Sequence, residues 1–200
     1  MSNPKANYRD GDAYTRMSKK YGYRSRSALK LKEILLKDIP IKKGMSVIDL
    51  GSFPGGWTQV AKEKVGDKGT VVGVDIQNTQ AIEGTFFINK SISEIADNDF
   101  EEFGEKLPFD LVLSDMAPNI SGIREKDDAQ IIYLIDNVLS VIDNFLIKEG
   151  FALIKVFQGE SLDYTRKALR DRFKTCKVSK PKASRSNSRE TYIIGKGLKK

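Results

Sequence analysis

The sequence predicts a single α/β domain of Rossmann-like type, with helices on both faces of a seven-stranded, mostly parallel sheet. From residue 45 onward, short apolar runs alternate with longer amphipathic segments. This order is typical of parallel strands joined by right-handed crossover helices. Two late strand-like runs are separated only by a loop. Because a loop of that kind joins antiparallel neighbours, one C-terminal strand is expected to pair antiparallel.

The two ends of the chain differ from this alternating middle. Residues 1–20 are polar and show no periodicity, which predicts a loose N-terminal arm before a folded part at 21–195 and a basic tail at 196–200. A partial apolar face predicts the first helix at 25–37. Pro40 follows it, and the residue before a proline avoids helical geometry. We therefore expect one domain made of a folded body with two polar ends.

The spacing of the apolar residues predicts the remaining elements. Short runs rich in Val, Ile and Phe favour strands, whereas longer segments with a helical period favour helices. The predicted strands span 46–50, 70–75, 85–89, 109–114, 150–157, 174–179 and 191–195. The predicted helices after the first one span 56–65, 92–104, 127–147 and 160–172.

The chain has no histidine and a single cysteine, Cys176, and both facts narrow its chemistry. Without histidine it lacks the Ser-His and Cys-His nucleophile systems and a common metal ligand. One cysteine excludes an internal disulfide and a cysteine metal cluster. Any proton transfer must therefore use Lys, Asp, Glu, Tyr or water, and we expect no metal requirement. No apolar run has the length of a membrane span, and no targeting peptide is visible.

Charge is distributed unevenly along the chain, although the total is +7. Residues 1–43 carry a net charge of +8, residues 44–163 carry −12, and residues 164–200 carry +11. If the basic head and the basic tail meet in space, they form one positive face suited to a polyanion. The simpler alternative is that the lysines only solvate the surface.

The most informative stretch is Val47-Ile48-Asp49-Leu50-Gly51-Ser52-Phe53-Pro54-Gly55-Gly56-Trp57, a strand followed by a glycine turn and a helix. Glycines let the backbone approach a ligand closely. The turn lacks the G-x-G-x-x-G pattern of a dinucleotide site and the Lys-Ser/Thr pair of a P-loop. It therefore favours a ligand without phosphates, and S-adenosylmethionine is the leading candidate.

Three charged side chains are associated with the ends of later strands, at the edge where open α/β sheets bind ligands. Asp75 ends the second strand, about twenty residues after the glycine turn, where an acid can accept hydrogen bonds from ribose hydroxyls. Asp115 follows the fourth strand, and Lys155 lies within the fifth. A buried lysine is costly without a partner. The alternative is that its stem packs while the ammonium reaches solvent.

These motifs closely resemble those of the FtsJ-type ribosomal RNA 2′-O-methyltransferases. The resemblance runs from Tyr21 to Ile193, nearly the whole chain. Its most specific segments are the glycine turn with Trp57, Ser114-Asp115-Met116-Ala117-Pro118-Asn119, Lys155-Val156-Phe157-Gln158-Gly159-Glu160, and the stretch from Ser186 to Tyr192. The resemblance implies a methyltransferase fold that uses S-adenosylmethionine and releases S-adenosylhomocysteine.

The resemblance also implies site residues. The family's catalytic Lys-Asp-Lys-Glu set corresponds to Lys30, Asp115, Lys155 and Glu190. The implied cofactor-binding residues are Gly51, Ser52, Pro54, Gly55, Gly56, Trp57, Asp75, Ser91 and Asp115. Ser91 stands where bacterial members often carry Asp, and its hydroxyl can still accept or donate a hydrogen bond. The predicted RNA-binding cations are Arg24, Arg26, Lys180, Lys182, Arg185 and Arg189, and Tyr21 or Tyr23 could stack a splayed base.

The implied reaction is methyl transfer to a ribose 2′-hydroxyl, and the family's typical target is a uridine in the A-loop of large-subunit ribosomal RNA. Lys155 would orient and deprotonate the hydroxyl. It could instead steer the oxygen and stabilise charge while water takes the proton. The alternatives are a transfer-RNA anticodon-loop methyltransferase and a non-catalytic ribosome-assembly factor. We expect a monomer acting on ribosomal RNA or the large subunit, without membrane contact. In a bacterium the protein would be cytoplasmic. In a eukaryote it would lie in the matrix of the mitochondrion or of another organelle, or in the nucleus.

Overall fold

The computed structural model of the chain describes residues 13–106, 108–118, 121–185 and 188–200. Seven strands form one sheet in the order β3-β2-β1-β4-β5-β7-β6. The first five strands pair in parallel, and β7 is antiparallel to both of its neighbours. The strands are β1 (Ser46–Leu50), β2 (Thr70–Asp75), β3 (Phe86–Asn89), β4 (Phe109–Ser114), β5 (Leu146–Phe157), β6 (Phe173–Ser179) and β7 (Glu190–Leu198). The predicted fold class is confirmed.

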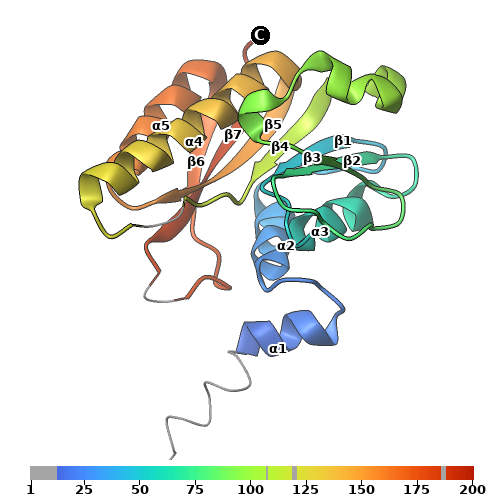
Figure 1. The fold of residues 1–200 in the computed structure, drawn as a ribbon, viewed down its shortest axis with the longest axis horizontal. Coiled ribbons are helices and arrows are strands. Elements are labelled where there is room, and N and C mark those ends of the chain that lie inside the picture. The colour runs from blue at the N-terminus through green and yellow to red at the C-terminus, as the bar shows by residue number, and fades with distance from the viewer. Residues whose placement is uncertain (1–12, 107, 119–120, 186–187) are drawn as a thin grey trace, which may run out of the picture.

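Helices cover both faces of the sheet (Figure 1). Five α-helices are described: α1 (Ala13–Lys20), α2 (Ser27–Lys37), α3 (Gly56–Val65), α4 (Arg124–Phe145) and α5 (Glu160–Arg172). Helices α4 and α5 lie on one face, α2 and α3 lie on the other, and α1 projects beyond α2. Along the described residues, no helix combines the length and apolar character needed to cross a membrane.

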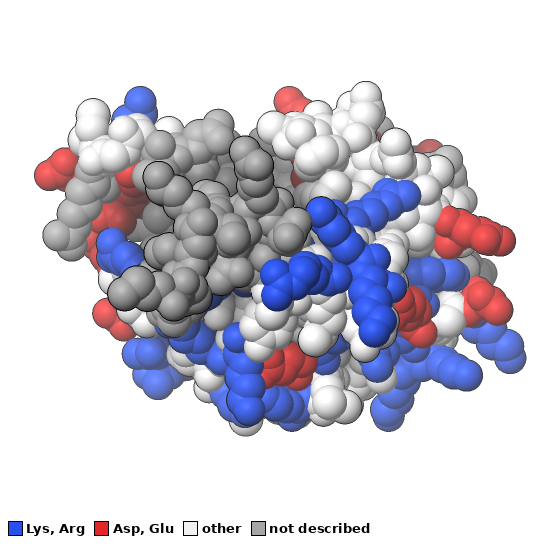
Figure 2. Space-filling model, turned by 90° about the horizontal axis from the view of Figure 1, so that it is seen from below, with Lys and Arg blue, Asp and Glu red and all other residues white. Residues whose placement is uncertain are grey.

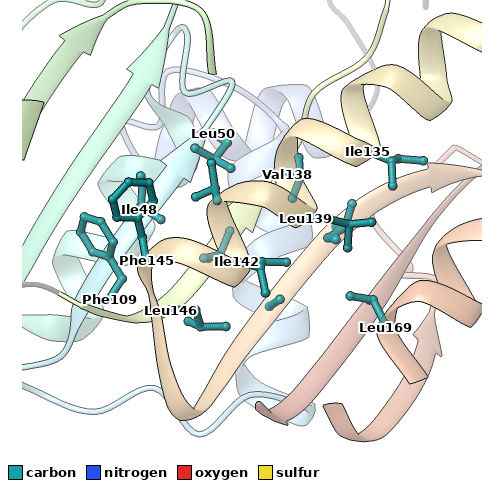
Figure 3. Packing of buried hydrophobic residues seen from close by; sticks show 14 of the residues in the cluster. Ile48, Leu50, Phe109, Ile135, Val138, Leu139, Ile142, Phe145, Leu146 and Leu169 are labelled. Carbon is teal, nitrogen blue, oxygen red and sulfur yellow. The ribbon is translucent and has the colours of Figure 1, made fainter. Parts of the chain in front are cut away.

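The alternation of side chains along each strand creates two hydrophobic cores. Ile48 points to the face packed by α4 and α5 (Figure 3), and Val112, Ile154 and Ile193 belong to the same buried cluster. The residues next to them in sequence, such as Leu113 and Leu153, point to the face packed by α2 and α3. Successive residues of a strand face opposite sides, so these central strands are buried on both sides and lack polar alternation.

The N-terminal segment corrects one prediction, since residues 13–20 form helix α1 where a loose arm was expected. The helix ends in Lys19 and Lys20, a favourable position for cations at a negative helix end. Ser18 is the only one of its residues that is buried. The helix has only eight residues, which is shorter than the stretch over which a helical period can be recognised in a sequence. Residues 1–12 of the predicted arm lie outside the described residues.

The segment predicted as a helix at 92–104 forms two 3₁₀ helices, η2 (Ile92–Glu94) and η3 (Asp97–Lys106). Short polar side chains bond to the local backbone there. The Ser91 hydroxyl accepts from the N–H of Ser93, and the Asp99 carboxylate accepts from the N–H of Ala96. Such bonds compete with regular helical hydrogen bonding, which explains the difference.

The last strand is longer than expected and includes most of the predicted basic tail. Strand β7 extends to Leu198, where it pairs with Phe173 of β6, and Lys196 pairs with Phe151 of β5. Lys199 and Lys200 of the predicted tail lie beyond it. Strand β5 also begins earlier than predicted, at Leu146, directly after α4. Pairing with neighbouring strands sets these ends.

Phe100 should be a main support of the core beneath η3. Its side chain is fully buried, and its ring centroid lies 5.4 Å from that of Phe109 and 5.1 Å from that of Phe145. We expect Phe100→Ala to lower the free energy of unfolding by about 3–4 kcal/mol in urea denaturation, because it leaves a cavity. Leu36→Ala is the control, since Leu36 is 81% exposed and its loss should change stability by less than about 0.5 kcal/mol.

Candidate active site

The sheet brings distant charged residues to one edge. Parallel strands β1, β2 and β4 end there, which brings together the glycine turn, Asp75 as the last residue of β2 and Asp115 just after β4. Strand β7 runs antiparallel to β5, and its first residue, Glu190, pairs with the last residue of β5, Phe157. The beginning of β7 therefore lies at the same edge as the ends of the other strands. Helix α2 adds Lys30 from the face it covers.

At this edge, five side chains form one continuous chain of polar contacts. The Lys30 ammonium donates to Oε1 of Glu190 at 2.5 Å, and the Tyr192 hydroxyl lies 2.8 Å from the same oxygen. The Tyr192 hydroxyl also lies 3.1 Å from Oδ1 of Asp115. The Lys155 ammonium donates to the backbone carbonyl of Asp115 and lies 3.3 Å from its Oδ1. The four residues predicted as a set thus meet, and Tyr192 connects its two carboxylates.

Burial and neighbouring charges control the ionisation of this cluster. Burial raises the pKa of Asp115, and the cations Lys155 and Lys30 oppose that shift. Burial also disfavours the charged form of Glu190, but the hydrogen bond and charge of Lys30 outweigh it, so the pKa of Glu190 is lowered. Burial and the two carboxylates raise the pKa of Tyr192 far above its ordinary value. Tyr192 is therefore a permanent hydrogen-bond donor, and Glu190 remains a carboxylate.

The glycine turn is packed so closely against the rest of the protein that it has no room for side chains. Gly51 has a φ of 75°, and a Cβ atom there would lie 2.3 Å from Cγ of Met116. The neighbouring carboxylate of Asp75 is held by backbone N–H groups, accepting from Phe53 at 2.9 Å and from Gln77 at 2.8 Å. The Asp75 carboxylate is thus fixed at the end of β2 with lone pairs left for other donors.

Two buried polar atoms beneath this turn have no hydrogen-bond partner among the described residues: Oδ1 of Asp49 and Oγ of Ser52. The other Asp49 oxygen accepts from the Thr58 hydroxyl at 2.7 Å. Full burial raises the pKa of Asp49 to about 7. Nearby carboxylates add to this upward shift, whereas the hydrogen bond from Thr58 opposes it. Since buried polar groups are normally paired, these two atoms suit the polar groups of a small ligand bound at the turn.

Two predicted cofactor residues have local partners instead of facing the turn. Trp57 is buried, its indole N–H donates to the carbonyl of Ser27 at 2.9 Å, and its ring lies 5.7 Å from that of Tyr192. It supports the start of α3. The Ser91 hydroxyl lies 2.8 Å from that of Ser93, after β3. Contact of either residue with a ligand stays a prediction.

The predicted RNA-binding cations divide into two groups. Four of them hold backbone carbonyls: Arg24 binds Pro54, Gln80 and Ala81, Arg26 binds Ala183, Lys180 binds Ser188, and Arg189 binds Gln158. Lys182 and Arg185 are exposed, as are Lys180 and Arg189. Lysine and arginine gather on the face seen in Figure 2. The basic head and tail do meet, because Glu33 of α2 accepts from the N–H of Lys182 at 2.8 Å.

The two tyrosines predicted as possible base-stacking residues differ in their exposure to solvent. Tyr23 is buried and its hydroxyl donates to Glu63 at 2.8 Å, whereas Tyr21 is 62% exposed. Base stacking therefore stays a prediction for Tyr21 alone. Asn119 and Ser186, which belong to two of the motifs, lie outside the described residues. Within the described segments, no three acidic or thiol side chains are grouped to hold a metal ion.

Sequence reasoning missed Tyr192 as a site residue, and it included Asp49 in the glycine-turn stretch without giving it a role. Tyr192 stands two positions after Glu190 in a strand, and residues at that spacing share a face. This period could have revealed Tyr192. Asp49 interrupts an otherwise apolar strand, and an isolated buried carboxylate is costly unless it has a partner or a role.

Comparison with known proteins gives consistent similarities. The family of FtsJ-like methyltransferases matches residues 23–198. The chain is 40% identical to "Ribosomal RNA large subunit methyltransferase E" of Hahella chejuensis, covering 96% of this chain and 94% of that protein. It is 44% identical to the protein of the same name in Alkalilimnicola ehrlichii, covering 94% and 90%.

Solved structures extend the comparison to the fold. A Plasmodium falciparum protein assigned as a ribosomal RNA methyltransferase aligns with a TM-score of 0.78 and 26% identity, covering 88% of this chain and 98% of that one. Aeropyrum pernix fibrillarin with bound S-adenosyl-L-methionine aligns with a TM-score of 0.59 and 17% identity, covering 86% and 75%. The second similarity concerns the fold alone.

Asp49 should make stability depend on pH. Its pKa is raised from 3.8 to about 7 on folding, so the folded protein binds a proton that the unfolded chain releases. The stability of wild type relative to Asp49→Asn should be greatest below pH 4 and should be lost as the pH rises to about 7. The loss should be about 1.4 kcal/mol per unit of raised pKa. Urea denaturation at pH 5 and pH 8 measures it, and a pH-independent difference would contradict the assignment.

Proposed function

The chain belongs to the FtsJ-like methyltransferase family, and we propose that it transfers a methyl group from S-adenosylmethionine to a ribose 2′-hydroxyl of large-subunit ribosomal RNA. The observation that carries this proposal is the chain of polar contacts from Lys30 to Lys155, placed beside a glycine turn with unpaired buried polar atoms. The names of the bacterial relatives support ribosomal RNA as substrate. We further propose a uridine of the A-loop as the target.

The residues around the glycine turn fit S-adenosylmethionine, which supplies an activated methyl group on a sulfonium centre. We assign the backbone of Gly51, Gly55 and Gly56 to the cofactor site. Glycine is required at these positions because Cβ atoms would lie within 3 Å of Met116, Ile82 and Ser25 of the protein itself. Asp75 would accept from ribose hydroxyls, which are neutral donors to a charged acceptor. The free oxygens of Asp49 and Ser52 would pair with polar groups of the cofactor.

Lys155 is our candidate for the group that acts on the 2′-hydroxyl. Its ammonium is held by Asp115, through the backbone carbonyl and the carboxylate, and its side chain is only 10% exposed. A lysine fixed in this way can orient a hydroxyl oxygen. It can also accept the hydroxyl proton if the amine is neutral when substrate is bound. The alternative is a steering cation, with water taking the proton.

The remaining cluster residues would hold this arrangement. Glu190 is held as a carboxylate by Lys30, and Tyr192 donates toward it and toward Asp115. We propose that Lys30 and Glu190 place the RNA ribose and that Asp115 orients Lys155. The cluster is assembled within one chain, so we propose that the protein acts as a monomer. Because the similar proteins are bacterial and are named as ribosomal RNA methyltransferases, we propose that it acts in the cytoplasm of a bacterium.

The proposed function predicts a specific product. With S-adenosylmethionine, the wild-type protein should place a 2′-O-methyl group on large-subunit ribosomal RNA, detected by mapping 2′-O-methylated nucleotides. Lys155→Met should lower the single-turnover rate by at least about a hundredfold, because a positioned proton acceptor or donor is removed. Donor and RNA affinity should hold. Exclusive methylation of transfer RNA, or RNA binding without any methylation, would replace the proposal with one of the two alternatives.

A companion variant separates the two roles of Lys155. If the amine is a base, the wild-type rate should rise with pH, and Lys155→Arg should be slow and lose that dependence, since guanidinium stays protonated. A near-wild-type rate in the Lys155→Arg variant would exclude Lys155 as the base and would leave it the role of a steering cation.

RNA binding should depend on the exposed cations of the β6–β7 connection. Replacing Lys182 and Arg185 with Ala should reduce the slope of log affinity against log salt by about 0.7 for each phosphate that the protein no longer neutralises. Filter binding with A-loop RNA at several salt concentrations measures the slope. Lys167→Ala with Arg170→Ala is the control, because both residues lie on α5, across the sheet from α2. Equal slopes in the two double variants would exclude this connection from the RNA face.

A further inference from the structure

We propose that Arg24 is a positioning residue for the methyl-donor site, and that it acts by fastening the 80–82 segment to the glycine turn. This inference rests on the function proposed above and assigns Arg24 a role different from the phosphate binding expected from its charge. Its guanidinium donates to three carbonyls of two separate segments. One side chain thereby connects the turn after β1 with the segment after β2.

The hydrogen bonds of Arg24 come from both terminal nitrogens of its guanidinium group. One terminal nitrogen donates to Gln80 O at 2.6 Å and to Pro54 O at 3.3 Å, and the other donates to Ala81 O at 2.9 Å. A guanidinium is a planar fork with fixed donor directions, whereas an ammonium is a point charge. Only arginine can therefore hold the two segments in this geometry.

Packing places the same three groups in direct contact. Gly55, at the end of the turn, has a φ of 107°. A Cβ atom on it would lie 2.9 Å from Cδ1 of Ile82 and 3.1 Å from the Arg24 guanidinium nitrogen. The turn, the guanidinium and the 80–82 segment are therefore packed closely together, with no room for a side chain at position 55. Loss of Arg24 would remove the polar part of this packing.

Arg24 is itself fixed to the helix that begins at the turn. Its backbone N–H donates to the side chain of Gln59 at 2.9 Å, and the Gln59 amide donates to Gly22 O at 3.1 Å. A Cβ atom on Gly56 would lie 2.1 Å from Oγ of Ser25. The segment before α2 thus packs on the turn and on α3. It offers a rigid base from which the guanidinium reaches the 80–82 segment.

The consequence concerns the donor site because of where the 80–82 segment lies. It follows Asp75, the proposed ribose acceptor, within the connection from β2 to β3. We call the three hydrogen bonds of the Arg24 guanidinium the clamp. Without the clamp, the connection from β2 to β3 would lose the bonds that join it to the glycine turn. Donor binding would then have to order it, and that ordering lowers affinity. The phosphate-binding alternative is disfavoured because three of the five N–H donors of Arg24 already serve protein carbonyls.

The test compares three substitutions in the full chain. Arg24→Met removes the fork and keeps an apolar stem, Arg24→Lys keeps the charge, and Gln59→Met releases the base of the clamp. Arg170→Met is the matched control, since it removes one positive charge from α5. For each variant we would measure S-adenosylhomocysteine affinity by calorimetry, kcat and KM for the donor, the salt slope of RNA binding, and thermal unfolding. The emission of Trp57, the sole tryptophan, reports on the start of α3.

Arg24→Met and Arg24→Lys should each weaken S-adenosylhomocysteine affinity by about tenfold or more, the size expected for loss of charged hydrogen bonds. KM for the donor should rise in step while kcat at saturation stays within about threefold, since the reacting groups are untouched. The RNA salt slope should equal that of wild type. Gln59→Met should weaken donor binding less, and Arg170→Met should leave donor affinity unchanged.

Two results would overturn the role of Arg24. The first is donor affinity restored by Arg24→Lys together with a salt slope lowered by Arg24→Met, because both mark a phosphate-binding cation. The second is unchanged donor affinity in Arg24→Lys and Gln59→Met, which decide the question even if Arg24→Met fails to fold. A wild-type protein that binds no S-adenosylhomocysteine would instead contradict the proposed function.

Discussion

The antiparallel pairing of β7 with β5 is the constraint on which the site depends. Its register sets Lys155 opposite Tyr192 and Phe157 opposite Glu190. In a strand, residues two apart share a face, so Lys155, Tyr192 and Glu190 all point toward α2. A shift of one residue would send Tyr192 and Glu190 into the apolar layer under α4 and α5. The buried Ile193 and Ile194, which alternate between the two cores, oppose such a shift.

The two hydrophobic cores allow the fold to hold this charged edge. Lys30 comes from α2, whose residues Leu31, Ile34 and Leu35 are buried on the same face of the sheet. That packing delivers the Lys30 ammonium to Glu190. Removing charges from water is costly, and the cost is offset only when each charge meets a partner. Here each carboxylate has its own lysine, Glu190 with Lys30 and Asp115 with Lys155, and the Tyr192 hydroxyl joins the two pairs.

The N-terminal segment before α2 connects the substrate side with the ligand side. Arg24 reaches the glycine turn, while Arg26, two residues later, holds the carbonyl of Ala183 in the β6–β7 connection. Arg24 and Arg26, which look alike in the sequence, thus contact opposite sides of the site. The basic head and tail meet there, so their charges add on one face although they are separated along the chain.

The sequence by itself determined the α/β class, nearly all strands and helices, and the place of the ligand-binding edge. These features are local, since apolar period and glycine geometry act within a few residues. The glycine turn and Asp75 could be predicted for this reason, whereas Lys30 and Glu190 required a family resemblance. Only the tertiary structure decided that Tyr192 joins two carboxylates, that Asp49 keeps an unpaired oxygen, and that Arg24 clamps two loops. The contacts of Tyr192 with Asp115 and of Arg24 with Gln80 join residues 77 and 56 positions apart. Local pattern carries no information about such contacts, because packing and strand register create them.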